Sequence, residues 1–153
     1  MKEFYLAHSV SLIDQVRRWQ LMMEVRYNIK FINPFTNNPN EKLEELRKLK
    51  TKTATTRYLN QLSLNQCIEI MERDLMLIRK SDGVVAYFDR ATIGTSQEII
   101  TAWKLYGLPV YIITKRCMNH PWLKAIADES GGRMFRNRTE FKKFVKEEFG
   151  CRI

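Results

Sequence analysis

The chain has 153 residues, 44% of them hydrophobic, which suits a single domain over residues 1–153 with one ordinary buried core. The longest apolar run, near residues 84–88, is far shorter than the roughly 20 residues of a membrane span, and residues 1–3 do not begin a signal peptide. We therefore expect no membrane partner and a cytoplasmic protein, and the three cysteines, without any CxxC pair, argue against a disulfide framework.

The net charge is +9, from 26 basic and 17 acidic side chains. Residues 58–114 carry 5 basic and 6 acidic side chains, so the rest of the chain holds 21 basic and 11 acidic ones. We interpret this outlying charge mainly as solvated helix faces, for example at 42–57 and 136–146. A nucleic-acid surface and the attraction of phosphorylated small molecules rank below that interpretation, so we expect no nucleic-acid partner.

In the first half of the chain, residues 4–7 form an apolar run that predicts a strand, and an amphipathic stretch over 12–23 predicts a helix. A second strand is expected at 29–32, followed by a polar loop at 33–40. Residues 41–50 have helical character, and 51–56 are undecided. A longer helix is predicted over 62–79, with one apolar face made of Cys67, Ile70, Met71, Leu75 and Ile78.

In the second half, strands are predicted at 83–88, 109–114 and 133–135, and helices at 96–106, 122–128 and 139–149. The apolar run at 83–88 is typical of a strand buried on both faces. This alternation predicts an α/β fold: a flavodoxin-like, doubly wound, five-stranded parallel sheet in the order 2-1-3-4-5, with helices on both faces. A ligand is expected at the carboxyl ends of the first and third strands.

The loops after those two strands hold most of the polar candidates. Residues 94–98, Gly94-Thr95-Ser96-Gln97-Glu98, are predicted to open a helix, where free backbone N–H groups would keep the Glu98 carboxylate ionised, as a nucleophile requires. A competing interpretation makes Thr95-x-x-Glu98 a capping box. Both interpretations place Glu98 in the first turn of the helix.

Two further side chains each have two interpretations. Asp74 lies beside the apolar face of the long helix, where it either pairs with Arg73, Arg79 or a backbone group, or points into the ligand pocket. His8 lies at the end of the first strand, where it acts either as an acid/base or as a packed loop residue. The histidines belong to no metal-ligand motif, and the chain has neither a P-loop lysine motif nor GxGxxG, so we expect no metal and no cofactor.

Three segments together resemble the nucleoside 2-deoxyribosyltransferase superfamily: FYLAHS at 4–9, ERDL and SDGVVA within 72–86, and TIGTSQE at 92–98. The resemblance is greatest to the 2′-deoxynucleoside 5′-monophosphate N-glycosidase branch. It implies that Glu98 is the nucleophile on the anomeric carbon, that Asp74 orients the sugar or helps to protonate the departing base, and that Tyr5 positions both. A carboxylate that attacks this carbon gives a covalent glycosyl-enzyme, which water or a second base resolves.

The resemblance also implies where the substrate binds. Thr92 takes the place of the branch's phosphate-contacting serine, and Ser9 matches another. Ser11 replaces a phosphate-binding arginine, a role open to Arg17, Arg18 or Lys115. Apart from the resemblance, the residue types of the loop at 33–40 suggest that it covers the base, with Phe35 stacking on it, against the interpretation of ordinary turn structure. An asparagine similar to Asn119 reaches the sugar from a neighbouring subunit, which implies a dimer or larger homo-oligomer. The candidate substrate-binding residues are His8, Ser9, Phe35, Asp89, Thr92, Gly94, Thr95 and Asn119.

The predicted function is cleavage of the N-glycosidic bond of 2′-deoxynucleosides or their 5′-monophosphates. Water is preferred to a second base as acceptor, because Thr92 stands near where the transferases usually hold the base with an aspartate. Gly94-Thr95-x-x-Glu98 also resembles the end of the signature of lysine-decarboxylase-like phosphoribohydrolases. The alternative class is a non-catalytic nucleotide- or nucleic-acid-binding module on the same fold, favoured by the charge of +9.

Overall fold

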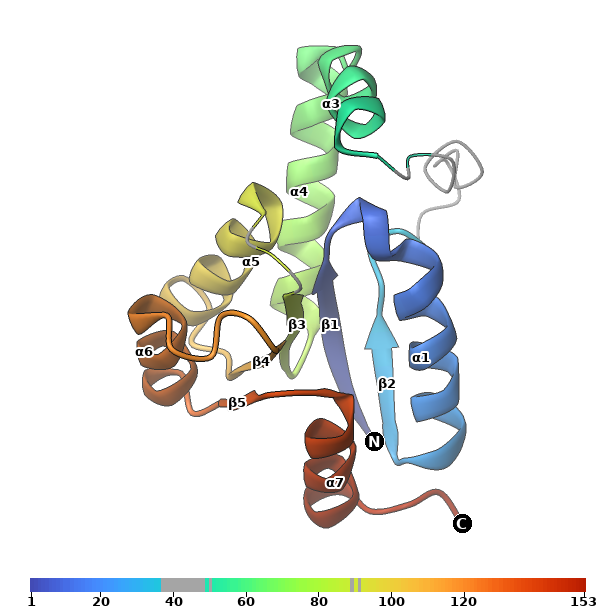
Figure 1. Cartoon of the computed structure of the whole chain (residues 1–153), viewed down its shortest axis with the longest axis vertical. Helices are drawn as coiled ribbons and strands as arrows, with labels where there is room; N and C mark the ends of the chain where they lie inside the picture. The colour runs from blue at the N-terminus through green and yellow to red at the C-terminus, as the bar shows by residue number, and fades with distance from the viewer. Residues whose placement is uncertain (37–48, 50, 89, 91) are drawn as a thin grey trace.

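The computed structural model describes residues 1–36, 49, 51–88, 90 and 92–153. Its centre is a five-stranded parallel sheet in the order β2-β1-β3-β4-β5, which confirms the predicted topology (Figure 1). Three strand ranges, at 29–32, 83–88 and 133–135, match the prediction to the residue. The strands are β1 (Lys2–His8), β2 (Ile29–Ile32), β3 (Gly83–Phe88), β4 (Val110–Thr114) and β5 (Arg133–Phe135).

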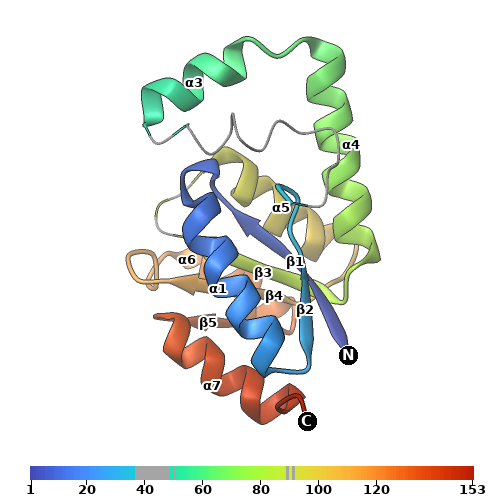
Figure 2. The same cartoon turned by 90° about the vertical axis from the view of Figure 1, so that its right-hand side faces the viewer.

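Helices cover both faces of the sheet and bury two apolar cores, as a doubly wound sheet requires (Figures 1 and 2). One face carries α1 (Ile13–Arg26), which follows the short 3-10 helix η1 (Val10–Leu12), together with α7 (Arg138–Phe149). The other carries α4 (Leu64–Lys80), α5 (Ile93–Lys104) and α6 (Pro121–Glu129). Helix α3 (Lys52–Asn60) lies beyond the sheet, beside the start of α4. No helix within the described ranges has the length and apolar character to cross a membrane.

Strand β1 lies between β2 and β3 and has no exposed face. Tyr5 and Leu6 are both 0% exposed, and they point to opposite cores because successive side chains alternate along a strand. Tyr5 belongs to the α4–α6 core and Leu6 to the α1–α7 core. The register pairs Tyr5 with Val84 and His8 with Tyr87. Strand β1 is therefore held by a strand on each edge and by a core on each face, so the side chains that it carries have fixed positions.

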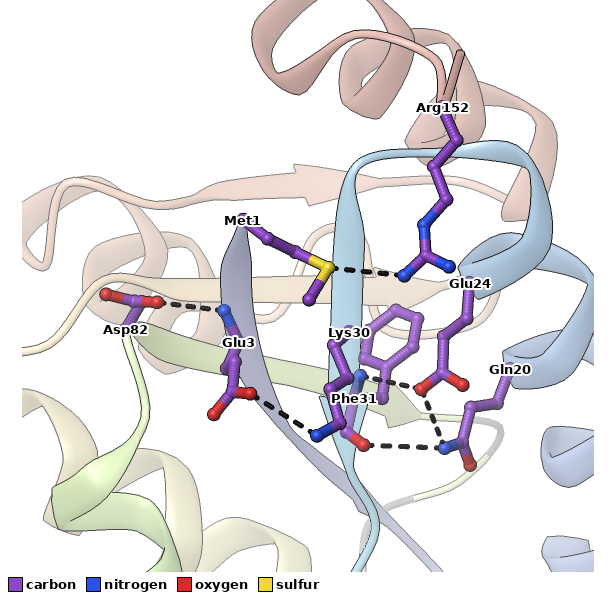
Figure 3. Close-up of polar contacts among 8 residues, drawn as sticks. All are labelled: Met1, Glu3, Gln20, Glu24, Lys30, Phe31, Asp82 and Arg152. Carbon is purple, nitrogen blue, oxygen red and sulfur yellow. Dashed lines mark hydrogen bonds and ion pairs between the residues drawn. The ribbon is translucent and has the colours of Figure 1, made fainter.

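Polar contacts fix β2 to its neighbours (Figure 3). The backbone N–H of Phe31 donates to Glu24 Oε1 at 2.8 Å, and Gln20 Nε2 donates to the same oxygen at 3.0 Å. On the other side, Lys30 Nζ lies 3.4 Å from Glu3 Oε1. Gln20 is 2% exposed, so its amide needs these partners, and its Oε1 accepts from Asn33 Nδ2 at 3.1 Å.

The structure corrects two predictions about helices. The helix expected from residue 96 begins at Ile93, with Thr92 as its N-cap residue. The apolar face of the long helix is only partly buried: Met71 is 55% exposed and Cys67 is exposed, whereas Ile78 is 0% exposed. Figure 1 shows the reason, because the first half of α4 extends past the end of the sheet and only its second half can pack on it.

The remaining predictions differ at helix boundaries or fall outside the described ranges. The undecided residues 51–56 lie at the start of α3, where the Thr51 side chain accepts from the Ala54 N–H at 3.1 Å. The helical character expected at 41–50, apart from residue 49, and the second half of the loop at 33–40 lie outside the described residues. Between β4 and β5 the approach is so close that a Cβ on Gly132 would lie 1.9 Å from the Val110 carbonyl oxygen.

Candidate active site

Tyr5 and Glu98 are joined directly. The Tyr5 hydroxyl donates a hydrogen bond to Glu98 Oε1 at 2.6 Å, which is at the short end of the range for O–H···O contacts. Tyr5 is fully buried on β1, and Glu98 is half-buried in the second turn of α5, a helix that packs on β1 and β3. Two predicted catalytic residues, 93 positions apart in the chain, are therefore brought into contact by the fold.

Glu98 is held in a setting that favours its protonated form. Burial raises its pKa from 4.5 to about 8, the Tyr5 hydrogen bond lowers it, the charge of Asp74 raises it and that of Arg73 lowers it. The prediction that the helix terminus keeps Glu98 ionised is wrong, because the pKa of Glu98 is raised and not lowered. Because α5 begins at Ile93, Glu98 lies beyond the first turn, where the free N–H groups and the dipole have their effect.

The same helix start overturns the capping-box interpretation. Thr95 lies inside α5 and is 3% exposed, so it is not the N-cap residue. Its hydroxyl oxygen accepts a hydrogen bond from the Thr92 hydroxyl at 3.0 Å, while Glu98 bonds to Tyr5. The Glu98 side chain therefore does not cap the helix, and it points toward Tyr5 on β1.

Asp74 and Arg73 form an ion pair on α4 beside this contact. Arg73 donates to Asp74 Oδ1 from Nη2 at 2.8 Å and from Nε at 3.0 Å, and the two side chains are 17% and 20% exposed. The charges of both act on Glu98, and both act on Tyr5, whose pKa is raised well above 10 by burial, then by Glu98 and Asp74. Asp74 therefore forms the ion pair with Arg73 that its first interpretation expects, and the second, that it points into the ligand pocket, stays a prediction.

We call Tyr5, Arg73, Asp74 and Glu98 the Glu98 cluster. Sequence reasoning considered Arg73 only as a counterion, although its position next to Asp74 in the ERDL segment was a signal that it belongs to the site. In the structure its positive charge favours the charged form of the Glu98 carboxylate. The cluster thus holds two carboxyl groups, one cation and one phenol around a single point of β1.

His8 lies on the other side of β1 from Tyr5, as the alternation along a strand predicts. It is 4% exposed, its Nδ1 lies 2.9 Å from the Ser9 carbonyl oxygen, and its ring centroid is 4.9 Å from that of Phe35. A carbonyl only accepts, so Nδ1 carries the proton, and burial lowers the pKa of the ring. These contacts favour the packed-residue interpretation for His8, and they place the Phe35 ring against His8.

The other predicted binding residues follow the carboxyl ends of the strands. Ser9 precedes η1, and its Oγ is 2.9 Å from the Ser11 Oγ. Gly94 is exposed in the first turn of α5, and Asn119 is exposed on the loop after β4. Asp89 lies outside the described residues. The structure thus joins Tyr5, Asp74 and Glu98, and it leaves Asn119 on a separate loop.

A hollow of about 560 Å³ lies on α3, away from these residues. It contains none of the predicted site residues, and α3 itself lies beyond the sheet. We therefore define the candidate site by the Glu98 cluster. The hollow is lined by Thr53, Thr56, Arg57, Asn60 and Gln61.

Comparison with known proteins gives a structural relative only. No family model and no curated protein matches the sequence. A solved structure of a 2-deoxyribosyltransferase from the psychrotolerant bacterium Bacillus psychrosaccharolyticus is similar, with a TM-score of 0.59, 15% sequence identity and 99% of each chain covered. The chain therefore shares the fold of this 2-deoxyribosyltransferase over nearly its whole length.

Proposed function

We propose that the protein cleaves the N-glycosidic bond of 2′-deoxynucleosides or their 5′-monophosphates, as the N-glycosidase branch does, and passes the deoxyribosyl group to water. Transfer to a second base is the alternative outcome of the same chemistry. The observation that carries the proposal is the 2.6 Å hydrogen bond from Tyr5 to Glu98 inside a cluster that also holds Asp74. The shared fold with a 2-deoxyribosyltransferase supports it.

The reaction has two steps. An oxygen of the Glu98 carboxylate attacks C1′ of the sugar, the C1′–N bond breaks, and its electron pair leaves with the base, which takes up a proton from solvent or from Asp74. Water then attacks C1′, the bond to Glu98 breaks, and the proton of the water passes to solvent. The Tyr5 hydroxyl holds Glu98 Oε1 in place through both steps.

Attack requires ionised Glu98. With a pKa of about 8, roughly a tenth of the free protein carries this carboxylate at pH 7. The Tyr5 hydrogen bond and Arg73 both favour the ionised form. The ion pair with Arg73 also favours a charged Asp74, which supports the sugar-orienting role more than the proton-donating one.

We further propose a homodimer or larger homo-oligomer in the cytoplasm. Large apolar side chains exposed on α4 and at the start of α5 support burial against a second copy, namely Leu64, Met71, Met76 and Ile93. Three cysteines without disulfides, Cys67, Cys117 and Cys151, support a reducing compartment. Light scattering coupled to size-exclusion chromatography tests the oligomeric state.

The function is tested by chromatography after incubation with deoxynucleosides, their 5′-monophosphates and the ribose counterparts, each with and without a second base. Free base from the monophosphates without an acceptor establishes the hydrolase, whereas new nucleosides only with the added base establish the transferase. Glu98→Gln is the matched control and should abolish both. No turnover with any substrate would refute the proposal and favour the non-catalytic binding module.

A further inference from the structure

Three loops at one edge of the sheet each carry exposed basic side chains. Arg90 follows β3, Lys115 and Arg116 follow β4, and Arg136 follows β5, and all four are exposed. These strands are neighbours in the sheet and run parallel, so their carboxyl ends meet at the same edge. We call these four residues the basic edge.

The strand register brings the basic edge together more closely than the sequence suggests. Phe88 pairs with Thr114, and Ile113 pairs with Phe135. The residues that follow these pairs therefore leave the sheet side by side, and the loops after β3 and β5 are about 10 Å apart, two strand spacings. The interpretation of the outlying charge as solvated helix faces does not hold for Lys115, Arg116 and Arg136, because they lie in loops at one edge of the sheet.

No carboxylate among the described residues neutralises the basic edge. The ion pairs found within the described ranges join other residues: Lys2 with Asp82, Lys30 with Glu3, Arg73 with Asp74, and Lys143 with Glu147. Glu140 lies close to Arg136, but its Oε2 accepts the backbone N–H of Arg136 at 2.8 Å and so caps α7. Four cations thus face solvent over a short distance, which favours a ligand with several negative charges.

An exposed tryptophan accompanies these charges. Trp122 is 64% exposed in the first turn of α6, the helix that follows the loop with Lys115 and Arg116. Figure 2 shows this loop and the start of α7 together at the left of the view. In contrast, Trp19 is 5% exposed, and the ring of Trp103 is half-buried under the Lys104 ammonium at 3.8 Å. Trp122 therefore presents an exposed aromatic ring at the start of the helix that follows the Lys115–Arg116 loop.

We propose that the basic edge and Trp122 bind single-stranded nucleic acid. Cations that follow a phosphate backbone beside an aromatic ring that stacks on a base are the recurring elements of such sites. A single strand suits the surface because stacking on Trp122 requires a free base face, and four cations are more than one phosphate requires. None of these residues belongs to the Glu98 cluster, although Lys115 is also a candidate for the phosphate of the proposed substrate.

The test measures fluorescence anisotropy of a labelled oligothymidylate of about 20 nucleotides between 50 and 200 mM salt. For a single strand the slope of log K against log salt is about −0.7 per phosphate contact. The variant Lys115→Ala/Arg116→Ala/Arg136→Ala should therefore make the slope less steep by about 2. The matched control Arg79→Ala/Lys80→Ala/Arg133→Ala removes the same charge from exposed positions toward the opposite edge of the sheet and should leave the slope nearly unchanged.

Trp122→Ala should weaken binding about 5- to 100-fold at constant salt slope, and Trp122→Phe should restore part of it. Equal binding by both triple variants, or no binding by the native protein at 50 mM salt, overturns the proposal. Competition by deoxythymidine monophosphate as strong, per phosphate, as by the oligonucleotide also overturns it, because the edge would then serve a mononucleotide. Equal competition by polyglutamate would point to an acidic protein and overturn it as well.

Discussion

Replacing Glu98 by Gln should stabilise the protein at alkaline pH while it removes the nucleophile. Burial raises the pKa of Glu98 from 4.5 to about 8, so between these values the folded state binds more protons than the unfolded state. A carboxyl with a raised pKa therefore costs stability as pH rises from about 4.5 to about 8. The isosteric amide of Gln does not titrate, and its oxygen can still accept the hydrogen bond from the Tyr5 hydroxyl.

The magnitude follows from the size of the shift. One pKa unit corresponds to about 1.4 kcal/mol, so the native protein should lose about 3 to 4 kcal/mol between pH 5 and pH 8 that Glu98→Gln does not lose. The assay is urea unfolding of both proteins at pH 5, 6.5 and 8, followed by tryptophan fluorescence. Other titrating groups cancel in the difference between the two free energies of unfolding.

A control substitution at an exposed site, Glu129→Gln, should give a difference from the native protein that stays within about 0.5 kcal/mol at all three pH values. A constant difference between native protein and Glu98→Gln over this range would refute the reasoning. It would mean that the Glu98 carboxyl is as well solvated in the folded state as in the unfolded chain.

Three further changes test the site and the sheet. Tyr5→Phe removes a hydrogen bond that lowers the pKa of Glu98, so the rise of kcat/KM with pH should move above pH 8. Each unit by which the pKa of Glu98 increases should lower kcat/KM at pH 7 about tenfold. Arg73→Gln removes a positive charge that lowers the pKa of Glu98, so kcat/KM should again rise only at a higher pH. Arg73→Lys keeps the charge and should reverse part of this shift. Gly132→Ala should destabilise the protein by about 2 kcal/mol or more, because the new Cβ would lie 1.9 Å from the Val110 carbonyl oxygen. Urea unfolding measures this loss, and in the same assay Gly94→Ala should be neutral or slightly stabilising, since nothing lies within 4 Å of its Cβ position.

The sheet was predictable because its strands carry strong local signals. The apolar run at 83–88 and the alternation of strands with helices determine a parallel order with little room for alternatives. The start of α5 was less visible: Ile93 is 85% exposed and Gly94 follows it, so neither residue adds to an apolar periodicity. With the helix beginning three residues earlier than predicted, Glu98 lies beyond the first turn, and its burial raises its pKa.

The site was predictable in part. Resemblance selected Tyr5, Asp74 and Glu98, and the geometry joins them, but the effect of Arg73 on Glu98 depends on how α4 lies against α5. No local pattern contains that arrangement. The basic edge was still harder to predict from the sequence. Its four side chains come from three loops between residues 90 and 136, and these loops become neighbours only through the register of β3, β4 and β5.

The central place of β1 also has a consequence for synthesis. Phe4 pairs with Gly83, so the strand on one side of β1 leaves the ribosome about 80 residues after β1 itself. At roughly 5 to 20 residues per second, this interval lasts about 4 to 16 seconds. Until α4 follows late in this interval, Tyr5 and Leu6, which are fully buried in the folded protein, can pack only against β2 and α1. The nascent chain therefore carries an open strand edge until β3 arrives, and α5 brings Glu98 to Tyr5 only after that.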